Sequence, residues 1–216
     1  HFSFSKRKAK SIFYFQIIYK TLFCSILAIQ IQNFTQGGLS MEHWDLYDQH
    51  RNKTGNMITR GSEMAPNEFH LVVHVCIFNK QGEMLIQQRQ PFKYGWSNYW
   101  DVTCGGSAIS GDTSQQAASR ELFEELGITY DFENIRPQLT INFERGFDDW
   151  YLVDYEVNLD ELVLQPEEVQ GAKWVSREEI LQMIREDTFI PYYEHLIHML
   201  FDMRQNYGTI TRSSFK

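Results

Sequence analysis

The sequence predicts an α+β domain, an α/β/α sandwich in which a mixed β-sheet lies between helices. A run rich in β-branched residues, His70 to Phe78, is typical of a central strand. Short strand candidates on both sides of it alternate with segments that begin as capped helices, such as Ser176 to Glu179. Neither an internal repeat nor an interdomain linker interrupts the chain after residue 40. A single domain of layered helices and strands follows from these observations.

The elements are expected in a regular order along the chain. Near the start, a turn signal at 52–55 predicts a hairpin. Strands are expected at 44–48, 57–58, 70–78, 83–89, 100–104, 139–144, 150–157 and 174–175. The main helix precedes Gly127, and two more helices are expected, one after Ser176 and one from Tyr192 to about Arg204.

The segment from Gly106 to Ile128 carries the strongest signal in the chain. It reads GSAISGDTSQQAASRELFEELGI. Asp112, Thr113 and Ser114 are alternative N-caps for a helix, and Gly127 suits its C-terminal end. Apolar residues recur every four positions, at Ala118, Leu122 and Leu126, and predict a face buried against the sheet.

Three acidic residues share another face of this helix. Glu121, Glu124 and Glu125 stand at i, i+3 and i+4, where like charges repel and weaken a helix. Arg120 can pair with Glu124 along the helix or with Glu121 beside it. By itself this pattern also fits a solvated charged helix. Together with the nearby glycine pair, it favours a hard divalent cation such as Mg²⁺, which prefers oxygen ligands.

The segment resembles the Nudix box, G-x5-E-x7-R-E-U-x-E-E-x-G-U, where U is a bulky aliphatic residue. The matching positions are Gly106, Arg120, Glu121, Leu122, Glu124, Glu125, Gly127 and Ile128. The one departure is Asp112, which stands where the family has Glu. The resemblance implies a Nudix fold and Mg²⁺-dependent hydrolysis, with Mn²⁺ as a substitute, of a nucleoside diphosphate linked to another moiety. It also implies Glu121, Glu124 and Glu125 as metal ligands, with the Gly106 carbonyl assisting.

Residues 44–89 and 96–104 resemble the Nudix branch related to isopentenyl-diphosphate isomerase. In those isomerases a catalytic Cys precedes the box glycine and a metal-binding His follows it. Here the two positions are Gly105 and Ser107, and Cys104 is one residue too early, which on a strand turns it to the opposite face. We therefore expect hydrolysis. An isomerase and a catalytically silent, nucleotide-sensing Nudix domain are the alternatives.

The expected reaction is attack of water on a phosphorus atom of the diphosphate. Glu124, Glu125 or Glu168 is expected to take the proton, with Arg120 as a further catalytic residue. Arg89 and Lys93 are candidates for binding the substrate phosphates, although a solvated surface position is the preferred interpretation for Lys93.

Several other residues are weaker candidates. His70 and His74 share a face of one strand, where packing is a commoner role than metal binding. The acidic pair in 148–150 could lie in a loop or contact a base. Trp96 and Trp100 are expected in the core, with stacking on a nucleobase as the alternative.

Charge and cysteine usage limit the partners. The net charge of −8 argues against a general nucleic-acid binder, so the expected partner is a small-molecule diphosphate. No membrane partner is expected, and a homodimer is left open. Cys24, Cys76 and Cys104 form no CxxC pair, which favours the reducing cytoplasm.

The first forty residues differ from the rest. Basic residues at 6–10 precede an apolar run at 12–34 that polar residues interrupt, so it is a poor membrane span. A targeting segment is one interpretation. We favour another, because Gln36-Gly37-Gly38 can be encoded by a purine-rich ribosome-binding sequence upstream of Met41. Residues 1–40 are then a non-native or disordered leader, and 41–216 form the domain.

Overall fold

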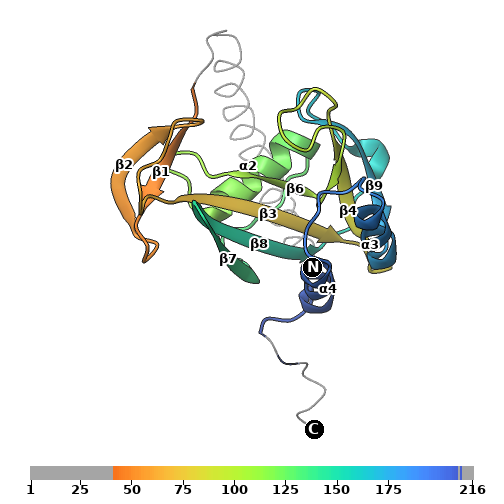
Figure 1. Cartoon of the computed structure of the whole chain (residues 1–216). Helices are drawn as coiled ribbons and strands as arrows, with labels where there is room; N and C mark the ends of the chain where they lie inside the picture. Colours follow the sequence, from red (N-terminus) through yellow and green to blue (C-terminus); the bar gives the residue numbers. More distant parts are fainter. Residues whose placement is uncertain (1–40, 209, 211–216) are drawn as a thin grey trace, which may run out of the picture. The chain divides into compact units, whose positions relative to one another are not determined.

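The computed structural model describes residues 41–208 and 210, so the interpretation of residues 1–40 lies outside the described part (Figure 1). Its strands are β1 (His43–Tyr47), β2 (Lys53–Thr59), β3 (His70–Phe78), β4 (Met84–Arg89), β5 (Trp100–Asp101), β6 (Cys104–Ser107), β7 (Leu139–Phe143), β8 (Gly146–Asp154) and β9 (Val169–Val175). Its helices are α2 (Ser114–Leu126), the short 3₁₀ helix η1 (Leu159–Glu161), α3 (Arg177–Arg185) and α4 (Glu194–Met203).

A seven-stranded mixed sheet forms the centre of the described chain. The strand order is β5-β4-β3-β8-β7, with β6 paired to β3 and β9 paired to β4. β3 and β8 are parallel, and the other pairs are antiparallel. The predicted central strand 70–78 is confirmed with the same limits, and it is almost wholly buried. β1 and β2 form the predicted N-terminal hairpin as a separate two-stranded sheet.

β3 changes its neighbour along one edge, and this change prepares the site. At its end, Phe78 pairs with Met84 of β4. Further back, Val72 to Val75 pair with β6 instead. β3 and β4 therefore separate beyond Phe78 and Met84. β4 continues between β5 and β9 and carries Gln87, whereas β6 carries Gly105 and Gly106 along β3.

Helices cover both faces of the sheet, which confirms the predicted sandwich (Figure 1). On one face, α2 buries its predicted apolar residues against β3 and β8, in a core that includes Ala118, Leu122, Leu126, Val73, Val75, Tyr151 and Val153. On the other face, α3 and α4 pack in a second core that includes Ile180, Ile197, Leu200, Cys76, Phe78, Trp150 and Leu152. No helix of residues 41–208 is long and apolar enough to cross a membrane.

The helix starts follow their capping residues. The Thr113 side chain accepts from the Gln116 backbone N–H and so decides between the three alternative caps of α2. Gly127 ends α2 at φ 71°, a left-handed conformation that favours glycine. α3 begins with the predicted capping box between Ser176 and Glu179.

Several predicted boundaries are wrong. The hairpin turn lies at 48–52, because the Asp48 carboxylate accepts from the backbone N–H groups of His50 and Asn52 at 2.9 and 2.8 Å. The single strand expected at 100–104 is divided between β5 and β6. β8 starts at Gly146 and β9 starts at Val169, both earlier than predicted. The prediction missed these starts because polar residues interrupt the apolar pattern in both segments.

Candidate active site

The acidic half of α2 lies against the backbone of β6. A Cβ atom at Gly106 would collide with the carboxyl group of Glu121. Only glycine at this position therefore lets the Glu121 carboxylate approach the strand so closely. The Glu121 carboxylate and the Gly106 backbone therefore lie close together, and their shared role in a metal site stays a prediction.

Arg120 holds the acidic residues of the helix together. Its guanidinium group lies 2.9 Å from Glu121, 3.0 Å from Glu124 and 3.2 Å from Asp112, and it donates to the Ser107 carbonyl at 3.0 Å. Burial alone would lower the pKa of Arg120, but the three carboxylates raise it. The shorter Asp112 therefore still reaches Arg120, and Arg120 pairs with both glutamates that the sequence left as alternatives.

Glu125 points toward the sheet and is only 5% exposed. Its Oε2 accepts a 2.6 Å hydrogen bond from Nε2 of Gln87 on β4. Burial, followed by the charge of Glu121, raises the pKa of Glu125 to about 8. Burial also raises the pKa of Glu121, although Arg120 opposes the shift. Both shifts have the same main cause, which is the burial of carboxyl groups close to one another.

The glutamates suit a hard cation by their donor atoms, but they do not converge on one point. Within residues 41–208, no three His, Cys, Asp or Glu side chains are arranged to hold a metal ion. Arg120 holds Glu121 and Glu124, while Gln87 holds Glu125. A cation bound here would have to displace a proton and loosen the Arg120 contacts, while Gly106 leaves room for the Glu121 carboxylate.

Two cations lie close to the acidic residues. Lys93 is only 17% exposed and forms an ion pair with Glu168, so the prediction of a solvated lysine is wrong. Burial and the charge of Arg89 lower the pKa of Lys93. Arg89 lies 4.0 Å from Asp101, and its buried Nε has no hydrogen-bond partner among the residues that the structure describes. The structure thus brings Arg89, Lys93 and Glu168 to the side of the site formed by β4.

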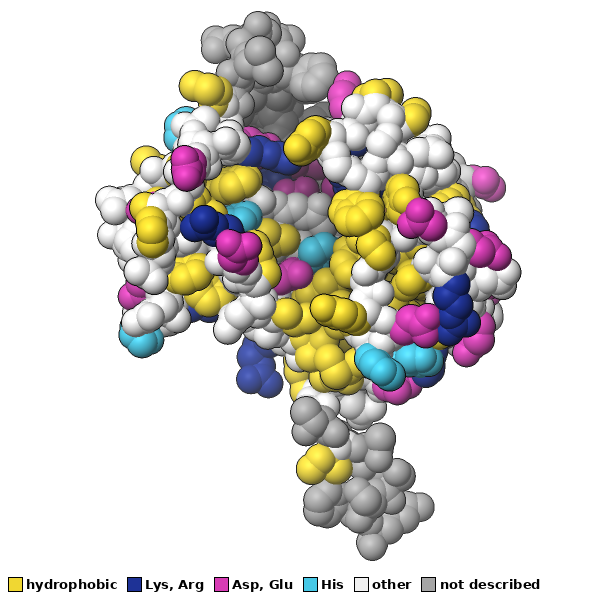
Figure 2. All heavy atoms as spheres, in the orientation of Figure 1, with side chains coloured by type: hydrophobic (Ala, Val, Ile, Leu, Met, Phe, Trp, Pro, Cys, Tyr) yellow, Lys and Arg dark blue, Asp and Glu magenta, His cyan; other side chains and the backbone are white. Residues whose placement is uncertain are grey.

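A second polar cluster lies on the opposite face of the sheet. The His74 Nδ1 is 2.7 Å from Asp148, and the ring stacks on Trp150 with centroids 4.2 Å apart. Tyr192 lies 3.4 Å from His74 Nε2 and donates to Asp101 at 2.8 Å. Burial alone would lower the pKa of His74, but Asp148 raises it overall. Figure 2 shows this face, where histidine and acidic side chains are visible in a hollow between hydrophobic ones.

The remaining aromatic candidates have separate positions. His70 stacks on Trp44 at 4.3 Å, and burial lowers its pKa to about 4, which fits a packing role. Trp96 is 49% exposed, so its predicted core position is wrong. Trp100 is partly buried, and the Lys173 ammonium lies 4.6 Å from its ring centroid.

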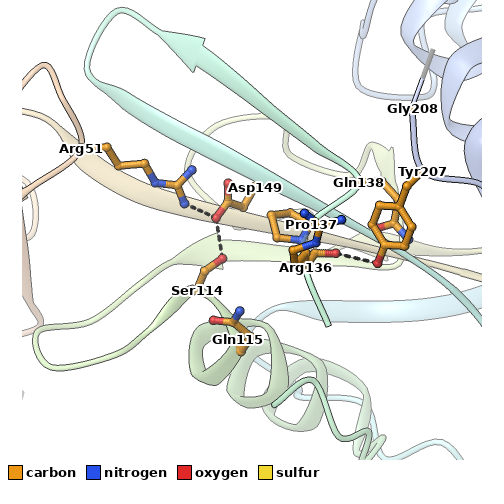
Figure 3. A pocket seen from close by; sticks show the side chains of 9 residues that line it. All are labelled: Arg51, Ser114, Gln115, Arg136, Pro137, Gln138, Asp149, Tyr207 and Gly208. Carbon is orange, nitrogen blue, oxygen red and sulfur yellow. Dashed lines mark hydrogen bonds and ion pairs between the residues drawn. The ribbon is translucent and has the colours of Figure 1, made fainter. Parts of the chain in front are cut away.

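A pocket of about 510 Å³ opens at the other end of α2 (Figure 3). Arg51 and Ser114 both bond there to Asp149, which is fully buried and also accepts from Thr140. Asp149 is thus a strand residue with compensated charge, and the loop interpretation of the acidic pair is wrong. Glu121, Glu124 and Glu125 lie in the second half of α2 and do not line this pocket.

The comparisons with known proteins identify the family of the chain. The model of the NUDIX domain matches residues 68–196. The chain belongs to the Nudix family. It is 48% identical over 164 residues to an uncharacterised Nudix hydrolase of Listeria monocytogenes, an alignment that covers 76% of this chain and 96% of that one. It is 30% identical over 156 residues to an isopentenyl-diphosphate Delta-isomerase of Streptomyces coelicolor, with 69% and 78% covered.

A crystal structure of a Deinococcus radiodurans protein has the same fold. Its TM-score is 0.59 at 25% identity, with 74% of this chain and 97% of that chain covered. The NUDIX model covers most of the described residues, and Nudix hydrolases and isomerases are both among the relatives of the chain.

From the sequence, the residue before the Nudix box is expected to differ between a hydrolase and an isomerase, and the structure describes this position. A Cβ atom at Gly105 would lie 2.6 Å from Cδ2 of His74, which Trp150 and Asp148 hold in place. A cysteine side chain at position 105 therefore has no room. Cys104 is fully buried in the core beneath α2, and burial raises its pKa well above the usual thiol value.

Three residues of these two clusters were not identified as candidate site residues from the sequence. Gln87 had a weak signal, because it is one of two glutamines that follow three apolar residues in β4. Asp101 had no sequence signal except that it stands shortly before Gly106, the first residue of the Nudix box. Tyr192 is 118 positions from His74, and no local pattern indicates that the two side chains meet.

Proposed function

We propose that the protein is a Mg²⁺-dependent Nudix pyrophosphohydrolase. Its substrate would be a nucleoside diphosphate linked to another moiety, cleaved at the phosphoanhydride bond. One observation carries the proposal: the Glu125 carboxyl group on the acidic helix is only 5% exposed and forms no ion pair within residues 41–208, so a bound cation would compensate its charge. Its burial raises its pKa, in agreement with this.

The residues have distinct parts in this reaction. Mg²⁺, or Mn²⁺ in its place, would be held by Glu121, Glu124 and Glu125 with the Gly106 carbonyl, and it would neutralise the phosphates and favour ionisation of water. Arg120, as the further catalytic residue, orients Glu121 and Glu124 through its present contacts.

The ion pair between Lys93 and Glu168 could be broken by a bound substrate, which would leave Glu168 free to act as a base. A substrate phosphate that binds Arg89 and Lys93 competes with Glu168 for the lysine. Glu168 is then available to accept the proton of the attacking water, a role that Glu124 or Glu125 could fill instead.

A screen for Mg²⁺-dependent cleavage, in which the phosphomonoester or pyrophosphate products are separated by chromatography, tests the proposal. Nucleotide sugars, dinucleotides, coenzyme A, nucleoside triphosphates and prenyl diphosphates cover the candidate substrates. We expect one class to be cleaved, and turnover of that substrate to collapse in the Glu124→Gln variant. Unchanged turnover in this variant would refute the assignment.

The isomerase relatives make a diphosphate isomerase the second candidate. The contact between Gly105 and His74 argues against it, because the cysteine of the isomerase pattern does not fit. Product analysis with isopentenyl diphosphate separates the two functions: an isomer of unchanged mass supports the isomerase, and released phosphate supports the hydrolase. The intact acidic residues argue against a catalytically silent sensor.

We also propose a cytoplasmic location and a small-molecule partner, with no nucleic acid involved. Cys76 and Cys104 are both free and buried, as suits a reducing compartment. The net charge of −8 opposes binding to nucleic acid. A homodimer is left open.

A further inference from the structure

Gln87 is a buried polar residue with an incomplete set of hydrogen bonds. Its side chain is on β4 and only 2% of the residue is exposed. Nε2 donates to Glu125 at 2.6 Å, whereas the buried Oε1 has no partner among the described residues. An unpaired buried carbonyl costs about 1–3 kcal/mol, so most native proteins avoid one.

The position of Gln87 is rigid. Its backbone lies in the middle of three strands, paired with Asp101 of β5 on one side and Ala172 of β9 on the other. Within residues 41–208, it provides the only side-chain hydrogen bond to the Glu125 carboxyl group. The orientation of Glu125 is thus set from the sheet, independently of the helix that carries it.

The two atoms of the amide have different consequences. The Nε2 bond occupies Oε2 of Glu125 and leaves the other carboxyl oxygen without a hydrogen bond from another side chain of the described part. Oε1 is joined to the same carbon as Nε2, so it lies close to the Glu125 carboxyl group. An acceptor at this position suits a water molecule in the coordination sphere of a cation, since Mg²⁺ usually keeps several waters.

We propose that Gln87 is a positioning residue of the metal site, which orients Glu125 through Nε2 and accepts a hydrogen bond from a metal-bound water through Oε1. This inference rests on the proposed function insofar as it assumes a cation at the acidic helix. Residues that contact metal ligands in this way typically change metal affinity or activity by about 10–100-fold when they are replaced.

Binding of Mn²⁺ alone, followed by electron paramagnetic resonance, tests the inference without any substrate. We expect Gln87→Met, which keeps the length of the side chain, to raise the Kd for Mn²⁺ by about 10–100-fold. Gln87→Asn keeps the amide but withdraws it from Glu125, and it should show the same loss; it decides the matter if the Met variant does not fold.

Gln88 provides the matched control. It is the next residue of β4, and its amide bonds to the backbone of Asn98 at 3.1 Å, away from Glu125. We expect Gln88→Met to keep the wild-type Kd for Mn²⁺. A folded Gln87→Met or Gln87→Asn protein with the wild-type Kd would overturn the inference.

The two proposals fail in distinguishable ways. If the wild-type protein hydrolyses a diphosphate but the Gln87 variants bind Mn²⁺ normally, the positioning role is wrong and the function stands. If the wild-type protein cleaves no diphosphate but the Gln87 variants lose Mn²⁺ affinity, the positioning role stands and the function is wrong. In an active enzyme, excess Mg²⁺ should also restore part of the lost kcat of Gln87→Met, which a purely structural defect would not allow.

Discussion

Two buried polar clusters occupy opposite faces of the same sheet, and they differ in how their charges are compensated. Under α2, burial raises the pKa of Glu125 to about 8, and the Gln87 amide oxygen has no hydrogen-bond partner within the described part of the chain. On the face of α3 and α4, His74 and Tyr192 connect two aspartates by hydrogen bonds.

In the second cluster, the side chains of His74, Asp148, Tyr192 and Asp101 all have hydrogen-bond partners. His74 donates to Asp148 and, when doubly protonated, to the Tyr192 oxygen, while the Tyr192 hydroxyl donates to Asp101. The first cluster has more negative charge than its described partners satisfy. The comparison teaches that a satisfied network holds a fold together, whereas an unsatisfied one is a candidate for ligand binding.

The largest expected effect concerns the unsatisfied cluster. Glu121→Gln keeps the shape of the side chain but removes a charge, and we expect kcat for the best diphosphate substrate to fall by more than about 100-fold, beyond the usual effect of residues outside the coordination sphere. Steady-state kinetics with Mg²⁺ measures this. Glu133→Gln, an exposed loop substitution, is the control, and equal losses in both variants would contradict the role of Glu121.

The satisfied cluster should instead affect stability. Asp148→Asn removes the counter-charge of His74, and we expect the free energy of unfolding in urea to fall by about 1–3 kcal/mol. The pKa of His74 is raised in the folded state, so its contribution is present below its ordinary pKa and is lost as pH rises through the folded value. Mn²⁺ affinity should not change, and a large change would break the distinction between the clusters.

The pH dependence of protein stability should reveal the raised pKa of Glu125. Because its folded pKa of about 8 exceeds the ordinary 4.5, its stabilising contribution is complete below pH 4.5 and disappears as pH rises through about 8. The metal-free protein should therefore have a lower Tm at pH 9 than at pH 6, and Glu125→Gln should reduce this difference. Saturating Mg²⁺ should also reduce it, and no response to Mg²⁺ would count against a metal at this site.

The smallest expected effect is that of one hydroxyl group. Tyr192→Phe removes the bond to Asp101, and we expect a loss of about 1 kcal/mol in the free energy of unfolding. Tyr193→Phe is the matched control, because Tyr193 is adjacent and 86% exposed. Equal stability of the two variants would show that the Tyr192 hydroxyl contributes nothing to the second cluster.

Local signals explain which parts of the fold could be predicted. The strand 70–78 is long and β-branched, and α2 and α3 have residues that define their ends, so these elements were found. The turn at 48–52 depends on one aspartate side chain, and the strand starting at Gly146 contains two aspartates whose compensation is visible only in three dimensions.

The site was predictable to the extent that it lies on one helix. The box residues of α2 lie together because of helical spacing. Gln87 meets Glu125 only through the packing of α2 on the sheet, and the parallel pairing of β3 with β8 brings His74 beside Trp150. Lys93 was misjudged because its short loop is polar and aromatic in sequence, yet its charge is turned toward Glu168.

The contact between Gly105 and His74 limits the order in which substitutions at these two positions can occur during evolution. A cysteine at position 105 would meet a histidine ring fixed by Trp150 and Asp148, so this substitution is unfavourable while His74 is present. His74 would have to be replaced by a smaller residue first. The two positions are thus epistatic, and the order of the mutations is restricted by the size of one imidazole ring.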